Sequence, residues 1–295
     1  QTHLAVARGG RRRYPQRMRR PSLRFILRGL ILGLAGLLLG LLWLSANLEA
    51  VILALAPGLS PRPTVGPTPP PPVLSVPRGD LPAGHAGLEE WAHFTDGGAG
   101  RIGSGFLLRL ETGAVLGVTT AHSLYFNGWP GRAVDQLAFR LPQTVEDLMS
   151  FSLFYGRPGR IFTGYNFHHD YVLLLPGKVP QGAPILEPDP RGGPQPGERV
   201  ALYSGLGDEA GEPRPLAGTV TAVSATALWA QMDDVFDAGG MSGSPLLSAH
   251  TGRVVGMAVS AGRTAPLLIG FHPIGSLIAR AAAADGAFEI RAYRP

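Results

Sequence analysis

Three short segments of the chain carry side chains that together could activate a hydroxyl group. They are residues 118–123 (VTTAHS), which contain His122, residues 170–175 (DYVLLL), which begin with Asp170, and residues 239–245 (GGMSGSP), which contain Ser242. A serine hydroxyl is a poor nucleophile until a base removes its proton. A histidine oriented by a carboxylate is such a base, so these residue types predict hydrolysis through an acyl intermediate.

Each of these segments adjoins a run that is typical of a β-strand. After about residue 82, short apolar or alternating runs recur between glycine, proline, asparagine and aspartate. This pattern predicts an all-β sandwich or barrel rather than alternating strands and helices. The runs are residues 104–110, 115–120, 136–141, 171–175, 200–203, 218–223, 227–232 and 253–259, and residues 275–285 (GSLIARAAAAD) predict one C-terminal helix.

The segments GSGF at residues 103–106, TAH, DYVLLL and GMSGSP follow one another in the order His, Asp, Ser. In this order they resemble the chymotrypsin/trypsin-like family of serine proteases, especially its bacterial, cysteine-free members, over about residues 100–285. The serine motif is similar to that of bacterial glutamyl endopeptidases. The resemblance implies two six-stranded-type β-barrels and a catalytic triad of His122, Asp170 and Ser242.

The resemblance also implies where an oxyanion and a substrate side chain would bind. The backbone N–H groups of Gly240 and Ser242 would form the oxyanion hole, and a glycine at position 240 permits the backbone conformation that this requires. The specificity pocket would have its floor near Phe236 and Asp237 and its wall at Val259, Ser260, Ala261 and Gly262. The wall carries no histidine and the floor no acid in the usual place, which favours a small or apolar preference. Met241 replaces the aspartate that pairs with a new N-terminus in zymogens, so we expect activity without N-terminal processing.

Composition excludes several other functions. The chain has no cysteine, which rules out disulfides and thiol catalysis. The net charge of +5 comes from residues 1–28, which carry nine of the 26 basic residues and no acid; 17 basic residues then face 21 acidic ones. The folded part therefore shows no footprint for nucleic acid. The histidines at 85, 93, 250 and 272 lack metal-ligand spacing, so neither a metal nor a cofactor is predicted.

The N-terminal third predicts a membrane anchor. Residues 29–48 are uncharged, and twenty helical residues rise about 30 Å, the thickness of a hydrocarbon core. The arginines before them indicate a cytoplasmic N-terminus and an extracytoplasmic C-terminal part. A cleaved signal peptide, with a site near residues 44–46 (LSA), is the alternative. GxxxG spacings in the anchor also allow a homodimer through the membrane helix.

The predicted organisation is thus a basic cytoplasmic tail at residues 1–28, a single transmembrane anchor at 29–56, a linker at 57–80 and a trypsin-like serine protease domain at 81–295. The linker has nine prolines in 24 positions and is expected to extend as a polyproline II spacer. The predicted function is a membrane-anchored serine endopeptidase acting on protein or peptide substrates.

Two other functions remain to be separated from this one. The first is a protease-like binding or sensing module with little or no turnover, which Met241 and the indistinct pocket suggest. The second is an esterase of the α/β-hydrolase kind. The order of the three residues argues against it, because those enzymes run Ser, acid, His.

Overall fold

The computed structural model describes residues 66–125, 132–162, 164–206, 215–262 and 265–293, together with Gly33 and Gly36. The chain divides into two compact units, residues 1–57 and 58–295. The predicted tail, nearly all of the predicted anchor and residues 57–65 of the predicted linker lie outside the described residues. Within the described residues, no helix has the length and apolar character needed to cross a bilayer.

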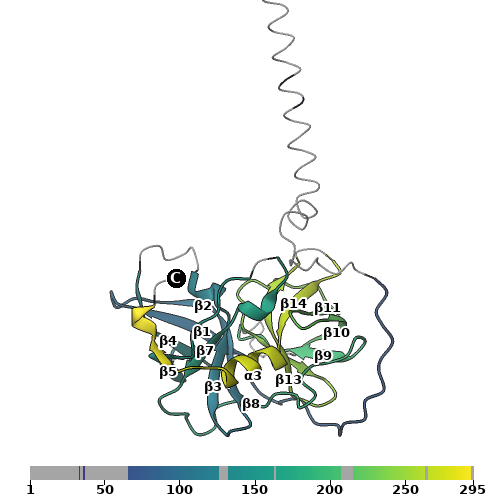
Figure 1. Ribbon diagram of the computed structural model, residues 1–295, viewed down its shortest axis with the longest axis horizontal. Coiled ribbons are helices and arrows are strands. Elements are labelled where there is room, and N and C mark those ends of the chain that lie inside the picture. The colour runs from purple at the N-terminus through teal and green to yellow at the C-terminus, as the bar shows by residue number, and fades with distance from the viewer. Residues whose placement is uncertain are drawn as a thin grey trace, which may run out of the picture. The chain divides into compact units, whose positions relative to one another are not determined.

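The first half of the second unit is a curved sheet of nine strands (Figure 1). Its order is β15-β6-β7-β3-β2-β1-β4-β5, and β8 pairs in parallel with β2. The strands are β1 (Leu88–Phe94), β2 (Ala99–Arg109), β3 (Val115–Thr119), β4 (Val134–Arg140), β5 (Met149–Phe151), β6 (Leu153–Tyr155), β7 (Val172–Leu175), β8 (Ile185–Leu186) and β15 (Ala287–Glu289).

This sheet corrects the expectation of a closed six-stranded barrel in the first half. The sheet ends at β5 on one side, and β6 lies next to the other end. These two strands are consecutive in the chain, since β5 ends at Phe151 and β6 begins at Leu153. Ser152 therefore interrupts the ladder where a closed barrel would continue, and the sheet forms a half-barrel.

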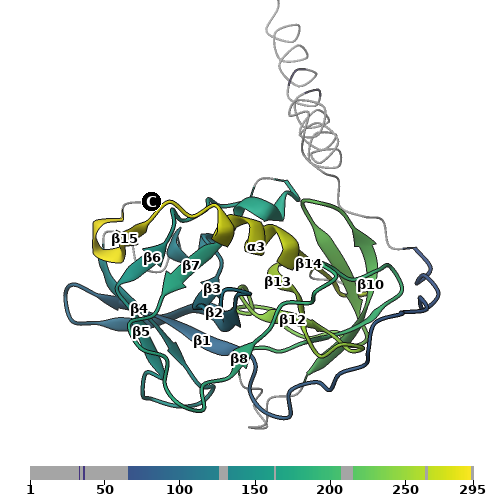
Figure 2. The same cartoon turned by 60° about the horizontal axis from the view of Figure 1, so that its bottom comes forward.

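The second half confirms the expected closed barrel of six strands. Their order around the barrel is β10-β11-β14-β13-β12-β9. The strands are β9 (Arg199–Leu202), β10 (Leu216–Val223), β11 (Leu228–Met232), β12 (Pro245–Ser248), β13 (Val254–Ala261) and β14 (Leu268–Pro273). The predicted C-terminal helix is α3 (Ile274–Ala282), which follows β14 and crosses in front of the boundary between the two halves (Figures 1 and 2).

Three groups of buried side chains hold this unit together. One fills the half-barrel and includes Leu137 and Phe151, and one fills the closed barrel and includes Leu246 and Phe271. The third joins residues of both halves with residues of α3, so it lies between the halves. Because apolar burial contributes about 25 cal/mol per Å², this shared core fixes the two halves against each other.

The described end of the predicted linker lies against the closed barrel instead of extending freely. Its exposure alternates along residues 71–77, as expected for an extended segment on a surface. Gly79 N–H donates to the carbonyl of His250 at 2.8 Å, and His250 Nε2 lies 2.8 Å from the carbonyl of Val76. The hydroxyl of Tyr203 donates to the carbonyl of Pro82 at 2.9 Å. Residues 66–82 therefore form a strap along the barrel.

Candidate active site

The pairing of β3 with β7 brings His122 and Asp170 to one edge of the first sheet. The two strands are antiparallel, and their last pair is Thr119 with Val172. His122 opens a short 3-10 helix, η1 (His122–Tyr125), just after β3. Asp170 ends another, η2 (Phe167–His169), just before β7. His122 follows Thr119 closely and Asp170 precedes Val172 closely, so both lie near this last pair. This explains why two residues 48 positions apart in sequence are in contact.

The carboxylate of Asp170 binds both the ring and the main chain of His122. Oδ2 lies 2.7 Å from His122 Nδ1, and Oδ1 accepts the N–H of His122 at 3.0 Å. The Asp170 side chain is fully buried, whereas the His122 side chain is 14% exposed. The ring of Phe162 packs edge-on against the imidazole at 5.9 Å. Nδ1 is thus held by the acid, and Nε2 is the other ring nitrogen.

Ser242 lies in the loop between β11 and β12, where the peptide groups are fixed in direction. The carbonyl of Met241 accepts the N–H of Ser244 at 2.9 Å, so the N–H of Ser242 on the same peptide points the opposite way. Gly240 has a φ of +80°, a conformation that glycine adopts readily. Among the described residues, neither the N–H of Gly240, the N–H of Ser242 nor the Ser242 hydroxyl has a hydrogen-bond partner.

The main chain of Ser242 lies beside the turn that carries His122. A Cβ built on Gly103 in β2 would lie 3.2 Å from the Ser242 carbonyl oxygen and 3.5 Å from Cβ of Ser123. Ser123 is the residue after His122, so the two loops meet over Gly103. Ser104 fastens them further, since its N–H donates to the Ser242 carbonyl at 2.8 Å and its hydroxyl to the Gly240 carbonyl at 2.9 Å.

A small cavity of about 30 Å³ lies next to Ser242. It is lined by Leu202, Ala238, Met241, Ser242, Ala258, Val259, Ser260, Ala261 and Ile269. Three residues of the predicted pocket wall are therefore present, but Gly262, Phe236 and Asp237 do not line the cavity. Phe236 packs against the core of the closed barrel, and the Asp237 carboxylate accepts the N–H of Gly239 at 2.9 Å. Ala238, one residue further on, lines it instead.

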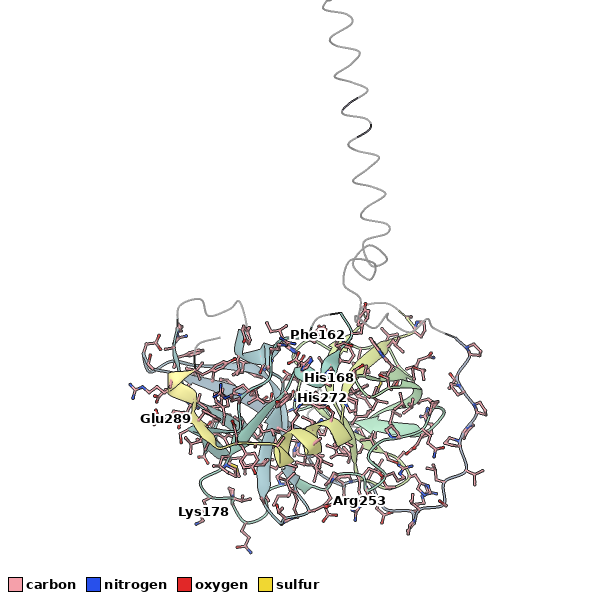
Figure 3. The ribbon with its side chains drawn as sticks, viewed as in Figure 1. Phe162, His168, Lys178, Arg253, His272 and Glu289 are labelled. Carbon is pink, nitrogen blue, oxygen red and sulfur yellow. The ribbon has the colours of Figure 1, made fainter. Side chains whose placement is uncertain are left out.

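The neighbouring histidines have other surroundings. Figure 3 shows Phe162, His168 and His272 along the boundary between the halves. Burial lowers the pKa of His272 to about 4, against the hydrogen bond to the Pro273 carbonyl. Burial, the neighbouring His169 and two arginines lower the pKa of His168. The sequence included Ser104 in the GSGF segment but gave it no role, and it did not reveal Phe162 or Ala238, because single apolar residues carry no motif.

The arrangement defines a chymotrypsin-like all-β fold, with a histidine–aspartate pair in the half-barrel and a glycine-rich serine loop in the closed barrel. Across the described residues, no group of three or more His, Asp or Glu side chains could hold a metal ion. No family model matches the sequence, and no curated protein matches it.

Several solved structures are similar to the chain in fold at low sequence identity. The active form of the Rv3671c protease from M. tuberculosis has 13% identity and a TM-score of 0.46, covering 76% of this chain and 95% of that one. A scabies mite inactivated protease paralogue has 16% identity and a TM-score of 0.47, with 65% and 90% covered. Kallikrein-related peptidase 10 has 18% identity and a TM-score of 0.44, with 64% and 91% covered.

Proposed function

We propose that this protein is a serine endopeptidase with His122, Asp170 and Ser242 as its triad. The observation that carries the proposal is the bidentate contact of the buried Asp170 carboxylate with His122. With Nδ1–H donated to Asp170, the imidazole presents the lone pair of Nε2 as a base. The loop between β11 and β12 that carries Ser242, here called the nucleophile loop, lies beside the turn that carries His122. Enzymes without substrate often form the serine–histidine hydrogen bond only when substrate binds.

The reaction follows from these positions. His122 Nε2 takes the proton of the Ser242 hydroxyl as Oγ bonds to the substrate carbonyl carbon, and the N–H groups of Gly240 and Ser242 bind the oxyanion. The imidazolium gives its proton to the leaving amine as the peptide bond breaks, which leaves an acyl-enzyme. Water, deprotonated by the same imidazole, then attacks the acyl carbon. The imidazolium returns its proton to Ser242 Oγ as the bond to the serine breaks and the acid leaves. Asp170 holds the ring and stabilises its cationic form throughout.

The cavity next to Ser242 supports a preference for a small side chain before the cleaved bond. Its volume of about 30 Å³ leaves no room for a long side chain. None of the lining residues carries a charge, so an arginine, lysine or glutamate would find no counter-ion there. Peptides with alanine, serine or glycine at that position are therefore the proposed substrates.

We also propose that the uncharged segment at residues 29–48 anchors the protease in the cell membrane, with the protease domain on the extracytoplasmic side. The proposal rests on the length of this segment and on the nine arginines that precede it. The membrane lipids and a protein or peptide substrate are then the partners, and the GxxxG spacings permit a homodimer through the anchor.

A fluorophosphonate probe tests the enzymatic proposal on the full chain. The probe phosphonylates a serine only when a base activates it, so wild type should be labelled at Ser242 and His122→Ala should not. Ser244→Ala is the matched control, because Ser244 lies in the same loop and its buried hydroxyl has no hydrogen-bond partner among the described residues. Absence of labelling in wild type, with the protein folded, would favour a binding or sensing module.

A further inference from the structure

A carboxyl group lies at a core position directly behind the nucleophile loop. In β1, Leu88, Ala92 and Phe94 face the core of the half-barrel, and Glu90 shares their face because side chains alternate along a strand. Glu90 is fully buried. Its partner across the ladder with β2 is Gly103, whose missing side chain leaves room for the carboxyl: a Cβ there would lie 2.9 Å from Glu90 Oε2.

The hydrogen bonds around Glu90 require that it carries a proton. Oε2 lies 2.7 Å from the hydroxyl oxygen of Thr119, and the same hydroxyl lies 2.9 Å from the Ser104 carbonyl. A hydroxyl has only one hydrogen to donate, and a carbonyl can only accept. Both contacts are hydrogen bonds only if the Glu90 carboxyl donates to Thr119 and Thr119 donates to Ser104.

Two further observations agree with a neutral carboxyl. Glu90 Oε1 has no hydrogen-bond partner within the described residues, whereas a buried carboxylate needs several donors. Burial raises the pKa of Glu90 to about 8, against the opposing effect of the Thr119 and Ser123 hydroxyls. Glu90 is thus largely protonated at neutral pH and ionises in mildly alkaline solution.

The residue at the end of this chain of hydrogen bonds is the one that holds the nucleophile loop. Ser104 donates its N–H to the Ser242 carbonyl and its hydroxyl to the Gly240 carbonyl. The Gly240 carbonyl belongs to the peptide between residues 240 and 241, and the Ser242 carbonyl to the peptide between residues 242 and 243. These two peptides flank the one that carries the Ser242 N–H, and the first also adjoins the peptide that carries the Gly240 N–H, so they limit the directions of both oxyanion-hole donors. A shift of Ser104 would therefore turn those donors away from a bound oxyanion.

We propose that protonated Glu90 is a positioning residue of the active site, which acts through Thr119 and Ser104 to hold the carbonyls of Gly240 and Ser242. The inference rests on the proposed function. Loss of the Glu90 proton reverses the donor at Thr119, so Ser104 loses its hydrogen bond and the loop loosens.

The other titratable groups on the elements that pack against Glu90 are engaged elsewhere. Glu89 binds the Trp91 indole and Arg101 on the other face of β1, and His122 in η1 binds Asp170. β3 has no titratable side chain, and Arg109 lies exposed at the end of β2. In the nucleophile loop, Asp237 is exposed and caps Gly239. His93 of β1 and Arg140 of β4 both lie close to Asp147, and Asp135 of β4 pairs with Arg291. Tyr125 of η1 lies 3.0 Å from the Tyr293 hydroxyl. In the same loop as Ser242, Asp233 pairs with Arg199 and Asp234 is exposed. Glu90 is therefore the group on these elements whose titration would change the relay.

The test measures how fast a fluorophosphonate labels Ser242 in the full chain from pH 6 to pH 10. Glu90→Leu, which fills the space but cannot donate, should slow labelling at pH 7 by about 10- to 100-fold, because small displacements of reacting groups cost this much. Thr119→Val should do the same. Wild-type labelling should fall near pH 8, where Glu90 loses its proton. Glu90→Gln donates from its amide at every pH, so it should restore most of the rate lost in Glu90→Leu and should not show this fall.

Glu89→Gln is the matched control, since it removes the neighbouring acid from the opposite face and should leave the pH profile as in wild type. The proposal is overturned if wild type shows no fall in labelling near pH 8, or if Glu90→Gln retains it. It is also overturned if Thr119→Val labels at the wild-type rate. The last two variants keep the test decisive should Glu90→Leu fail to fold.

Thermal unfolding separates this inference from the proposed function. From the ordinary pKa of 4.5 up to about 8, folded wild type keeps a proton that the unfolded chain loses. Wild type should therefore lose stability relative to Glu90→Gln as pH rises through this window, and the difference should level off above it. Wild type that is never labelled contradicts the proposed function and the positioning role together. If Ser242 is labelled normally but the stability difference between wild type and Glu90→Gln does not change with pH, only the claim that Glu90 is protonated is contradicted.

Discussion

Asp170 shows how one buried side chain can set the chemistry of another. Its two carboxylate oxygens bind the ring and the main chain of His122, so the imidazole can neither flip nor swing away without losing a hydrogen bond. A fully buried carboxylate is tolerated there because donors surround it, including the more distant N–H of Phe162 at 3.4 Å. The orientation of the His122 ring is therefore fixed by contacts within the chain itself.

Asp170→Asn tests this orientation. The amide keeps the shape of the acid but favours the wrong tautomer of His122, so the rate of Ser242 labelling should fall by about 10⁴-fold. Fluorophosphonate kinetics at pH 7.5 would measure it, with Asp135→Asn, an exposed partner of Arg291, as the control that keeps the wild-type rate. An Asp170→Asn protein that is folded and labels within tenfold of wild type would show that the pair has no catalytic part.

Gly243 lies at a position where the backbone conformation and the neighbouring strand exclude any side chain. Its φ is +95°, and an added Cβ would lie 1.8 Å from the Ser104 carbonyl oxygen. Gly243→Ala should therefore cost more than about 3 kcal/mol, or prevent folding, because the strand behind it cannot move away. Gly113 has a similar φ of +84° but open space around it, so Gly113→Ala should cost only about 1 kcal/mol. Equal denaturation midpoints for the two variants would contradict this.

At the scale of elements, strands with a continuous apolar run were predictable from sequence. Residues 253–259 correspond to β13, and residues 115–120 to β3, each within two residues. β1 was not predicted, since LEEWAHF places two acids inside a strand. Glu89 binds Arg101 as well as Trp91, and Glu90 contacts Thr119. No local pattern reports the partners that are distant in sequence, Arg101 and Thr119. The three-residue strands β5 and β6 are too short for an alternation to be visible.

Some residues of the candidate site were also predictable from sequence, and others were not. The motifs gave His122, Asp170 and Ser242, because nucleophile, base and acid must be of these residue types. The supporting hydroxyls of Ser104 and Thr119 have no required sequence context, and their roles depend on which carbonyl lies opposite them in the fold. The pocket floor was placed at Phe236 and Asp237, but the loop turns so that Ala238 lines the cavity.

The segments at one end of the closed barrel are joined by a buried ionic network. Arg191, after β8, donates to Asp189 at 2.7 and 2.8 Å and to Glu198, before β9, at 2.8 and 3.1 Å. Thr251, in the turn between β12 and β13, donates to Asp189 at 2.7 Å. Burial alone would raise the pKa of Asp189, but the hydrogen bonds from Arg191 and Thr251 lower it overall.

Arg191→Met should therefore leave two buried carboxylates without their counter-ion and cost about 3–5 kcal/mol at pH 7. The lowered pKa of Asp189 means that its stabilisation is present above the ordinary value of 3.8 and is lost as pH falls below it. The difference in the free energy of unfolding between wild type and Arg191→Met should thus become smaller in acid. Urea unfolding of the two proteins at pH 7 and at pH 3.5 measures this difference. Arg253→Met, which breaks the exposed pair with Glu187, should cost less than about 1 kcal/mol and serves as the control.

At the scale of the whole molecule, the proposed site needs both halves. His122 and Asp170 come from the half-barrel and Ser242 from the closed barrel, and the shared core between the halves sets their spacing. The strap at residues 66–82 adds a second tie, because it runs along the closed barrel and then enters β1 of the half-barrel. A chain that begins at residue 66 retains this strap, so we expect it to fold and to be labelled like the full chain.

The proposed membrane attachment depends on the residues before the strap. Twenty uncharged residues at 29–48 can span a hydrocarbon core of about 30 Å, and the arginines before them favour retention on the cytoplasmic side. The full chain should remain in the pellet after carbonate extraction of cell membranes, and the chain from residue 66 should appear in the supernatant. Leu38→Arg combined with Leu42→Arg should also release the protein, since each central arginine costs about 3 kcal/mol of insertion. If cells that express the full chain instead yield a protein in the supernatant whose mass lacks the first 46 residues, the segment is a cleaved signal peptide.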